Sequence, residues 1–337
     1  MAIRIGILGC GKMSKNHAKA IIEHPETELV GLCDLNEEII QNWFNEHLKG
    51  IINTSTAPQI FNDSSKMYSQ AQLDAVVIST PHTAHFKHGK EALLAGCHVF
   101  MEKPMVTSTA DARELKRLTE EIGKIVVIGY NTPSTPSFQY LRELVRKGNE
   151  GTGFLGRLEM VNGFLAQDWK RNTTGLWRQD PVFSGGGQAY DSGAHLLNSL
   201  VWTIESSPQK VFSLIDQMDT PVDINTVLVV SFKNNVMASI TISGNCPAEG
   251  ASMTFVFDSG RIDIDGWNGK WIHVYDSSAN EVKIELPEKK MTPLENFIDS
   301  ILGKDEPATS PLNGVMQSQL MDAIYDSGKS GLISLSN

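Results

Sequence analysis

Residues 3–18 are IRIGILGCGKMSKNHA, an apolar run that ends at two glycines and continues into a helical pattern. The apolar run predicts a buried strand over 3–9, and the pattern after the glycines predicts a helix that ends near Glu23. A strand, a glycine turn and a helix in this order form the first unit of many open α/β domains. The fold class then depends on whether the following sequence repeats this alternation.

The alternation does continue through the first third of the chain. Helical stretches separate four further apolar runs, LVGLCD (29–34), AVVIST (75–80), CHVFMEKP (97–104) and IVVIGY (125–130). Strands that are apolar throughout, rather than alternating, are typical of a parallel sheet covered on both faces. Residues 1–125 are therefore predicted to form a doubly wound α/β domain.

The pattern changes after Tyr130. The runs RLEMVNGF, QKVFSLIDQM, TVLVVSF, MASITISG, SMTFVFDS, GRIDIDG and KWIHVYDS are alternating or rich in aromatic residues, and turn sequences such as GWNG and SSAN separate them. Helical patterns at 293–302 and 315–327 follow. Residues 126–337 are predicted to form an α+β domain with a large, open, mainly antiparallel sheet.

Composition restricts the class of protein. The 337 residues are 41% hydrophobic and 20% charged, which suits a soluble chain of two domains. A formal net charge of -10 argues against nucleic acid or an anionic membrane as a partner, and no apolar window reaches the ~18 residues needed to span a bilayer. The four cysteines, Cys10, Cys33, Cys97 and Cys246, have no metal-site or disulfide spacing, so we expect a reducing cytoplasm.

The glycine turn has the spacing of a dinucleotide-binding motif. Gly9 permits the tight turn, and Gly11 lets a pyrophosphate approach the backbone. Backbone amides at the start of the following helix, near Lys12 and Met13, would face the negative charge. Because the motif follows the first strand and opens a helix, we expect a bound dinucleotide.

An acid at the end of the next strand indicates which dinucleotide. Asp34 can accept hydrogen bonds from both ribose hydroxyls and would repel a 2′-phosphate. Its neighbours Leu35 and Asn36 provide no arginine to bind such a phosphate. The sequence therefore favours NAD over NADP.

Several motifs, taken in order, resemble the Gfo/Idh/MocA family of oxidoreductases. They are GCGKMSKNHA, VVISTPHTAHFKHGKEALLAGCHVFMEKP, SGGGQAYDSGAHLLNSLVW and the closing TPLENFIDSIL…AIYDSGKSG. The resemblance implies a Rossmann domain followed by an open antiparallel sheet. It also implies hydride transfer between NAD(P) and a hydroxyl or carbonyl of a sugar, inositol or related polyol. The sheets of family members pair subunits, so a homodimer or homotetramer through the C-terminal domain is expected.

The resemblance also implies roles for individual residues. The catalytic set is the lysine of the EKP motif and the acid and imidazole of the D-x-G-x-H motif, namely Lys103, Asp191 and His195. Further cofactor contacts fall in the TPxxxH segment and in the acid before the lysine, namely Thr80, Pro81, His85 and Glu102. The acid that often follows three residues after the motif histidine is replaced here by Asn198.

Oxidation of an alcohol needs a group that takes the hydroxyl proton as the hydride leaves. Histidine is a residue type that titrates near neutrality, and a lysine beside the positive nicotinamide ring would lose its proton more readily. We assign His195 as the acceptor and Lys103 as its hydrogen-bonding partner, and the reverse assignment stays open. If residues 189–202 are helical, Asp191 and His195 project from one face.

Polar and aromatic residues upstream of the GGG run suit a polyol. Trp169 could stack on a sugar face, Arg178 could bond to hydroxyls, and Asn131 could border the nicotinamide. A surface loop with core tryptophans is the alternative. No metal is expected, because His82, His85 and His88 converge poorly on a helix and lack a nearby cysteine or carboxylate.

Two other functions fit the same motifs. An NAD-dependent glycosidase would oxidise one carbon transiently and then eliminate the aglycone, without the paired carboxylates of ordinary glycosidases. A non-catalytic sensor of sugars or dinucleotides is the second alternative. The presence of Lys103, Asp191 and His195 together argues against a sensor, which needs no proton acceptor.

Overall fold

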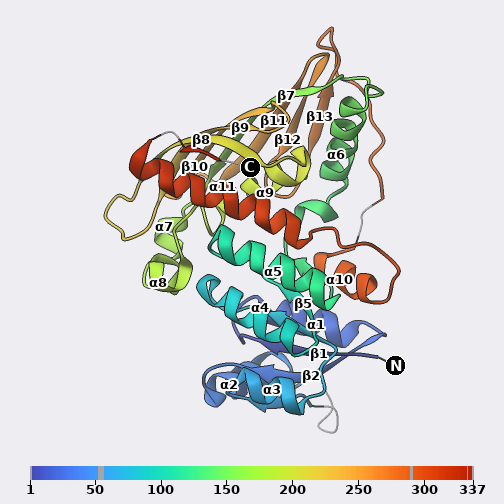
Figure 1. Cartoon of the computed structure of the whole chain (residues 1–337), viewed down its shortest axis with the longest axis vertical. Helices are drawn as coiled ribbons and strands as arrows, with labels where there is room; N and C mark the ends of the chain where they lie inside the picture. The colour runs from blue at the N-terminus through green and yellow to red at the C-terminus, as the bar shows by residue number, and fades with distance from the viewer. Residues whose placement is uncertain (1, 52–56, 289–290, 332, 336–337) are drawn as a thin grey trace. The chain divides into compact units, whose positions relative to one another are not determined.

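The computed structural model describes residues 2–51, 57–288, 291–331 and 333–335. The chain divides into two compact units (Figure 1). The first contains Met1–Gly129 and Pro293–Pro311, and the second contains Tyr130–Thr292 and Leu312–Asn337. The segment 293–311 therefore returns to the first unit after the chain has built most of the second. The two domains predicted from the sequence, residues 1–125 and 126–337, are each continuous in sequence, so they do not represent the return of residues 293–311 to the first unit.

The first unit is built on a parallel sheet. Its strands are β1 (Ile3–Leu8), β2 (Thr27–Cys33), β3 (Gln59–Phe61), β4 (Ala75–Ile78), β5 (His98–Met101) and β6 (Val126–Ile128). They lie in the order β3-β2-β1-β4-β5-β6, and every pair is parallel. This is the order of a Rossmann fold, whose strand order reverses between β1 and β4. The predicted α/β domain is confirmed.

Helices connect these strands and cover the sheet. They are α1 (Ser14–Glu23), α2 (Glu37–His47), α3 (Ser64–Gln70), α4 (His85–Leu94) and α5 (Thr109–Ile122). Side chains cap three of their N-termini, where Asn36, Asp63 and Ser108 accept backbone N–H bonds. The predicted helices form, but neither β3 nor α3 was predicted, because a three-residue strand carries too little pattern.

The interior of the first unit is apolar on both sides of the sheet. β4 is buried at all four residues, as is expected for a strand covered by helices on both faces. All four cysteines are free thiols, and burial raises the pKa of Cys33 to about 12. Among the residues that the structure describes, no helix is both long enough and apolar enough to cross a bilayer.

The returning segment completes this unit at the β6 edge. Helix α10 (Pro293–Ile301) buries Leu294, Phe297 and Ile298 in the same core as β1 and β5. Beyond it, the buried Thr309 hydroxyl donates to the Ile128 carbonyl (2.6 Å) and accepts from the Ile128 N–H (3.2 Å). Backbone groups of an edge strand that the sheet cannot satisfy are therefore satisfied by a segment far along the chain.

The second unit is built on a mixed, mostly antiparallel sheet. Its strands are β7 (Leu158–Ala166), β8 (Pro208–Asp216), β9 (Asn225–Phe232), β10 (Met237–Ser243), β11 (Gly250–Phe257), β12 (Gly260–Asp265), β13 (Ile272–Tyr275) and β14 (Ile333–Ser334). The order is β13-β12-β11-β7-β10-β9-β8-β14, and only β7 and β10 pair in parallel within the described residues. The predicted antiparallel sheet is confirmed, with this one parallel pair at its centre.

Helices cover one face of this sheet. They are α6 (Pro136–Asn149), α9 (Gly193–Ile204) and α11 (Pro311–Ser330), with the short α7 (Trp169–Asn172) and α8 (Pro181–Ser184) between β7 and α9. Helix α9 is buried at eleven of its twelve residues and packs into the core of the sheet. The sheet alternates buried and exposed positions, so its other face is exposed.

Candidate active site

The first part of the candidate site is the glycine turn between β1 and α1. Gly9 has a φ of +98°, and a Cβ there would lie 2.7 Å from the Ser79 carbonyl oxygen. Only glycine fits such a close approach in that conformation. A Cβ at Gly11, in contrast, would meet nothing within 4 Å, so the loop backbone is open on that side.

Asp34 lies directly beside this loop. Its carboxylate follows β2 and accepts the N–H of Cys10 at 2.7 Å and the N–H of Leu35 at 2.7 Å. Each carboxylate oxygen can accept a further hydrogen bond. The loop and the carboxylate are therefore held as one rigid element.

The geometry of this region fits a dinucleotide. The open backbone at Gly11 would accept a pyrophosphate, while Lys12 and Met13 lead from it into α1 and are exposed. The ordered carboxylate of Asp34 stands at the carboxyl end of β2, the edge at which open α/β sheets bind ligands. These are the features that such a cofactor requires.

The TPxxxH segment follows β4 at the same edge of the sheet. His85 is fully buried, with Nδ1 2.7 Å from the Pro104 carbonyl oxygen and Nε2 2.9 Å from the Thr80 carbonyl oxygen. Burial lowers the pKa of His85, so the neutral ring can donate to only one of these oxygens. Both ring nitrogens are occupied, which leaves neither for a metal. His85 instead joins Thr80, next to Pro81, to the turn after Lys103.

The EKP motif ends β5, and the Lys103–Pro104 peptide bond is cis. The Glu102 carboxylate lies 2.7 Å from His17 Nε2 on α1 and accepts the Lys103 N–H at 3.3 Å. His17 also packs edge-on against Phe100. The backbone that carries Lys103 is thereby tied to the helix that follows the glycine turn. Lys103 itself is partly exposed.

In the second unit, two hydrogen-bond donors hold the Asp191 carboxylate in a fixed position. Trp169 Nε1 donates to Asp191 Oδ2 at 2.8 Å, and Arg178 Nε donates to the same oxygen at 3.0 Å. Trp169 is only 4% exposed, which leaves little room for a sugar to stack on its ring. The condition for a shared helical face is not met, because Asp191 precedes α9, whose first residue is Gly193.

His195 lies in the first turn of α9 between two aromatic rings. Its ring centroid is 5.8 Å from that of Tyr130 and 4.8 Å from that of Trp267. A chain of hydroxyls holds this turn, since Ser199 donates to the His195 carbonyl (2.9 Å) and bonds to Thr132 (2.7 Å). The exposed Asn131 stands next to Tyr130 in sequence, before the short helix η3 (Thr132–Ser134).

A buried carboxylate holds the glycine-rich loop that leads to Asp191. Asp223 is 1% exposed and accepts the N–H groups of Gly187 (2.6 Å) and Ala189 (2.8 Å), as well as the Tyr325 hydroxyl. A Cβ at Gly187 would lie 2.0 Å from the Asp223 carbonyl oxygen. Burial raises the pKa of Asp223 against these hydrogen bonds. The glycines are therefore needed for a close approach of two backbones.

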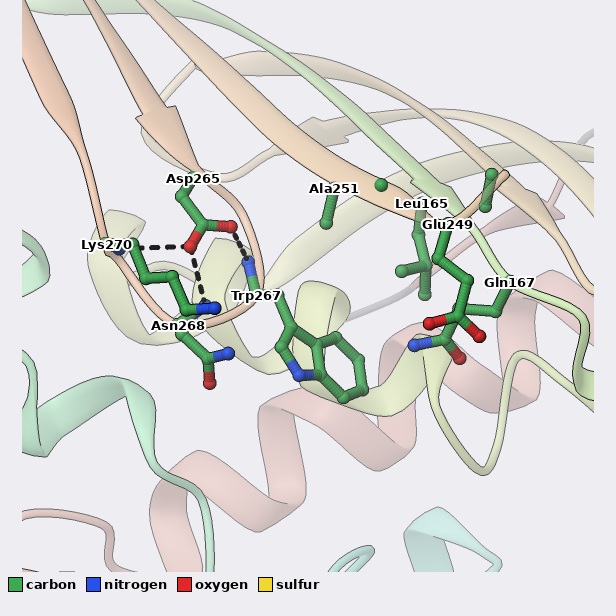
Figure 2. A pocket seen from close by; sticks show the side chains of 10 residues that line it. Leu165, Gln167, Glu249, Ala251, Asp265, Trp267, Asn268 and Lys270 are labelled. Carbon is green, nitrogen blue, oxygen red and sulfur yellow. Dashed lines mark hydrogen bonds between the residues drawn. The ribbon is translucent and has the colours of Figure 1, made fainter. Parts of the chain in front are cut away.

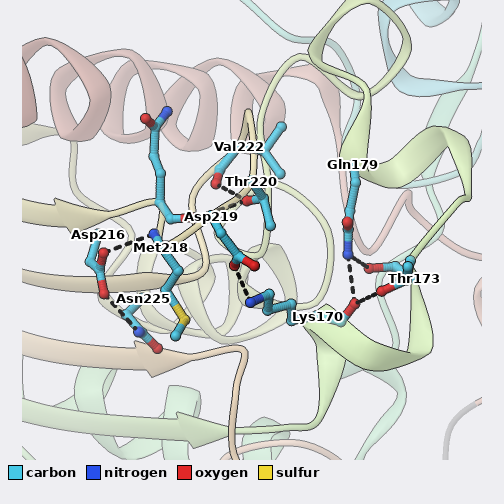
Figure 3. A network of polar contacts seen from close by, with 11 residues as sticks. Lys170, Thr173, Gln179, Asp216, Met218, Asp219, Thr220, Val222 and Asn225 are labelled. Carbon is cyan, nitrogen blue, oxygen red and sulfur yellow. Dashed lines mark hydrogen bonds and ion pairs between the residues drawn. The ribbon is translucent and has the colours of Figure 1, made fainter.

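A polar network fixes the segment that supplies Trp169 (Figure 3). Lys170 forms an ion pair with Asp219 in the β8–β9 loop, and its N–H donates to the Gly244 carbonyl at 2.7 Å. Gln179 donates to the Lys170 carbonyl at 2.6 Å and so closes α7 onto the following turn. Trp169 packs against Val222 from the same β8–β9 loop. The loop therefore holds the tryptophan that binds Asp191.

Sequence reasoning missed Asp223, Tyr325 and Trp267, although all three support the predicted residues. Three successive glycines at 185–187 indicate that another part of the chain comes close. They do not indicate which residue does so. Asp223 and Tyr325 lie 102 residues apart in sequence, and only the packing of α11 against the loop brings them together.

Two family models match the chain. Residues 3–130 match the oxidoreductase family with an NAD-binding Rossmann fold, and residues 138–263 match the GFO/IDH/MocA C-terminal domain. The protein is thus an oxidoreductase whose first unit is an NAD-binding Rossmann domain. The chain belongs to the Gfo/Idh/MocA family, as the sequence motifs indicate.

Individual relatives match over nearly the full length. D-glucoside 3-dehydrogenase of Escherichia coli is 23% identical, with 98% of this chain and 96% of that protein covered. The WlbA dehydrogenase from Bordetella pertussis, crystallised with NADH and UDP-GlcNAcA, is 24% identical at a TM-score of 0.82 over 100% of both chains. An aldose-aldose oxidoreductase from Caulobacter crescentus complexed with glycerol is 19% identical at a TM-score of 0.82, covering 99% and 100%. At these identities the two solved structures support the fold.

Removing the Tyr325 hydroxyl should destabilise the second unit. Tyr325→Phe takes a donor from the buried Asp223 carboxyl, and we expect the free energy of unfolding to fall by about 1–3 kcal/mol. Because the pKa of Asp223 is raised in the folded protein, its contribution to the free energy of unfolding becomes less favourable as the pH rises and the carboxyl group ionises. The ionised carboxylate depends most on the hydrogen bond that the Tyr325 hydroxyl donates. The loss should therefore be greater at about pH 8 than at about pH 5. Urea denaturation followed by circular dichroism measures both values.

Tyr140→Phe is the matched control, since Tyr140 lies in the same unit and its hydroxyl makes no hydrogen bond to the described residues. We expect that variant to differ from the wild type by less than about 0.5 kcal/mol. Equal losses in the two variants, or no dependence on pH for Tyr325→Phe, would show that the Asp223 bond is unimportant.

Proposed function

We propose that this protein transfers a hydride between NAD and a hydroxyl or carbonyl group of a sugar, inositol or related polyol. The observation that carries the proposal is the placement of Lys103 at the carboxyl end of β5, in the same parallel sheet in which the open glycine loop follows the carboxyl end of β1. The D-glucoside 3-dehydrogenase and aldose-aldose oxidoreductase activities of the relatives support a sugar-like substrate.

We propose that the dinucleotide is held by the loop at Gly9, Gly11, Lys12 and Met13, by Asp34, and by the edge residues Thr80, Pro81, His85, Glu102 and Lys103. When bound, NAD supplies the hydride acceptor. Glu102 acts through its bond with His17, which orients the backbone of Lys103. The buried His85 keeps the Thr80 and Pro104 segments in register.

We assign the proton transfer to His195 and Lys103. As a hydroxyl carbon loses its hydride, the hydroxyl proton moves to His195 Nε2 or Nδ1, while the Lys103 ammonium donates a hydrogen bond to the oxygen. The reaction requires both groups at one hydroxyl. The reverse assignment, with a neutral Lys103 as the acceptor, uses the same contacts.

Asp191 would orient or bind the substrate beside His195. Because Trp169 and Arg178 donate to it, the carboxylate is stabilised as an anion in a fixed position. We therefore assign Trp169 and Arg178 to the substrate region chiefly through Asp191. Asn131 borders the same region beside Tyr130.

The choice of NAD over NADP follows from charge. Asp34 would repel a 2′-phosphate, and the helix that follows it adds two more carboxylates, Glu37 and Glu38, in its first turn. The exposed Leu35 between them provides no cation.

We also propose that two or four copies associate through the exposed face of the second unit's sheet. That face carries a continuous group of exposed apolar side chains on adjacent strands: Met160, Phe164, Phe212, Leu214, Val227, Val229 and Met237. Contiguous exposed apolar surface of this extent is typical of an interaction site. Strand register places Phe212 beside Val229 and Leu214 beside Val227.

Replacing Lys103 tests the function. The wild type should reduce NAD+ with at least one member of a panel of aldoses, uronic acids, inositols and simple glycosides, measured by absorbance of the reduced cofactor. Lys103→Met should lower kcat by about 10²–10⁴-fold, while NADH affinity, measured by fluorescence, changes little. Lys87→Met, on the exposed face of α4, is the control and should keep full activity.

Turnover of Lys103→Met within about threefold of the wild type would contradict the catalytic assignment. Release of an aglycone without net reduction of NAD+ would instead indicate an elimination reaction at the same residues. No turnover across the whole panel would contradict the sugar or polyol substrate.

Asp34 variants test the cofactor assignment. Asp34→Ala should raise the KM for NAD+ by about 10–100-fold, because a charged hydrogen-bond acceptor is lost. Asp34→Asn keeps an acceptor for the Cys10 N–H but removes the charge, so discrimination against NADP+ should weaken while the loop stays ordered. Steady-state kinetics with both cofactors distinguish these effects. Tighter NAD+ binding in Asp34→Ala would refute the ribose role.

A charge placed on the exposed sheet face tests the association. Val229→Lys should convert the oligomer to monomers, because burying an unpaired ammonium in an apolar interface is costly. Sedimentation velocity gives the mass directly. Leu94→Lys is the matched control, since Leu94 is also exposed but lies on α4 in the first unit. A monomeric wild type, or an unchanged oligomer in Val229→Lys, would rule out this interface.

A further inference from the structure

A cavity of about 240 Å³ lies at one edge of the second unit's sheet (Figure 2). Gln167 and Glu249 form one side of it, and the loop 265–270 forms the other. Pockets for drug-sized ligands usually measure ~300–1,000 Å³. This cavity therefore suits a single ring with its substituents.

Strand register builds this cavity from three neighbouring strands. Ala166 at the end of β7 pairs with Gly250 at the start of β11, and Ser252 of β11 pairs with Asp265 at the end of β12. β7 and β12 therefore end, and β11 begins, at the same edge of the sheet. Gln167 and Glu249, which lie just beyond the paired residues, are consequently brought to one place although 82 positions separate them.

The loop 265–270 is rigid because a buried carboxylate organises it. Asp265 accepts the N–H groups of Trp267 (3.0 Å), Asn268 (3.3 Å) and Lys270 (3.0 Å), as Figure 2 shows. From outside the loop, the Ser137 hydroxyl donates to the Gly269 carbonyl at 2.8 Å. The indole of Trp267 is therefore held in place before any ligand arrives, which lowers the entropy cost of binding.

Trp267 connects the cavity to the proposed catalytic histidine. Its ring centroid lies 4.8 Å from that of His195, with the two planes inclined at 55°. The loop also packs directly on α9, since a Cβ at Gly266 would lie 2.9 Å from Leu196. A ligand group bound against Trp267 in the cavity would therefore lie next to a substrate group that contacts His195.

The chemistry of the lining suits a neutral polyhydroxylated ring. Trp267 offers an aromatic surface for C–H groups, while Gln167, Glu249, Asn268 and Lys270 offer donors and acceptors for hydroxyls. Among the described residues, the side chains of Glu249, Asn268 and Lys270 form no hydrogen bond or ion pair. Two carboxylates, Glu249 and Asp265, outnumber the single ammonium of Lys270, so a phosphate would be disfavoured.

We propose that this cavity binds a second, non-reacting glycosyl unit, so that the preferred substrate is a disaccharide or other glycoside rather than a free monosaccharide. The proposal rests on the proposed oxidation of a sugar hydroxyl near His195. Contacts to the non-reacting ring supply binding energy that holds the reacting ring in position. Glu249 and Trp267 are then specificity-determining residues.

The test compares sugars that differ only in the second ring. Methyl β-glucoside is paired with cellobiose, methyl β-galactoside with lactose and methyl α-glucoside with maltose, and UDP-glucose is the charged comparison. Binding is measured by isothermal titration calorimetry with NADH-saturated protein, so that it does not depend on turnover. Oxidation by NAD+ is followed in parallel. At least one disaccharide should bind about tenfold more tightly than its methyl glycoside.

Two variants should remove this preference. Glu249→Ala deletes the charged acceptor, and Ala251→Leu enlarges a side chain that lines the cavity. In both, the disaccharide and the methyl glycoside should bind within about twofold of each other. Glu159→Ala, an exposed acid on β7 away from the cavity, should keep the wild-type preference.

Three outcomes would overturn the inference: equal binding of disaccharides and methyl glycosides, a preference that both variants retain, or tighter binding of UDP-glucose that Ala251→Leu abolishes. Different outcomes distinguish a failure of the cavity proposal from a failure of the proposed function. Oxidation of methyl glycosides without a disaccharide preference would refute only the cavity. Disaccharide binding that depends on Glu249, without any oxidation, would support the cavity and refute the sugar dehydrogenase.

Discussion

Parallel pairing of β1 with β4 is the constraint on which the first unit depends. Because parallel strands share a direction, the residues that follow them all emerge at one edge. The glycine turn, the Thr80 segment and the EKP motif are more than twenty residues apart in sequence, yet each follows a strand of the same sheet. Asp34 then holds the glycine turn through the Cys10 amide, and His85, with a ring nitrogen within hydrogen-bond distance of each of the Thr80 and Pro104 carbonyl oxygens, links the other two loops.

The second unit depends instead on a buried carboxylate. Asp223 draws the backbone of 187–189 towards the β8–β9 loop and bonds to Tyr325 on α11. Moving a carboxylate from water into the protein interior costs several kcal/mol unless hydrogen bonds compensate. The loss of any one of these hydrogen bonds would therefore destabilise the unit. The same loop supplies Val222 and Asp219, which hold the segment with Trp169. Asp191 is thus positioned from two directions by residues outside its own motif.

Buried acids recur at the points where this unit needs a fixed loop. Asp265 organises 265–270 in the way that Asp223 organises 187–189, and the first of these loops sets Trp267 against His195. In each case a carboxylate accepts several backbone N–H groups that no strand or helix satisfies. The candidate substrate region therefore has rigid walls made of loops, which is the arrangement that a selective binding site requires.

Local pattern was sufficient for most of the fold. The apolar runs and glycine turns predicted β1, β2, β4, β5 and β6, and alternation predicted the second sheet, because burial dictates the period of hydrophobic residues. The motifs also marked Lys103, Asp191 and His195. Local pattern could not reveal the return of 293–311 to the β6 edge, the parallel pairing of β7 with β10, or the position of Asp191 outside α9. It equally could not show that Trp169 binds Asp191 while Trp267 lines the cavity, because such contacts join residues that only packing brings together.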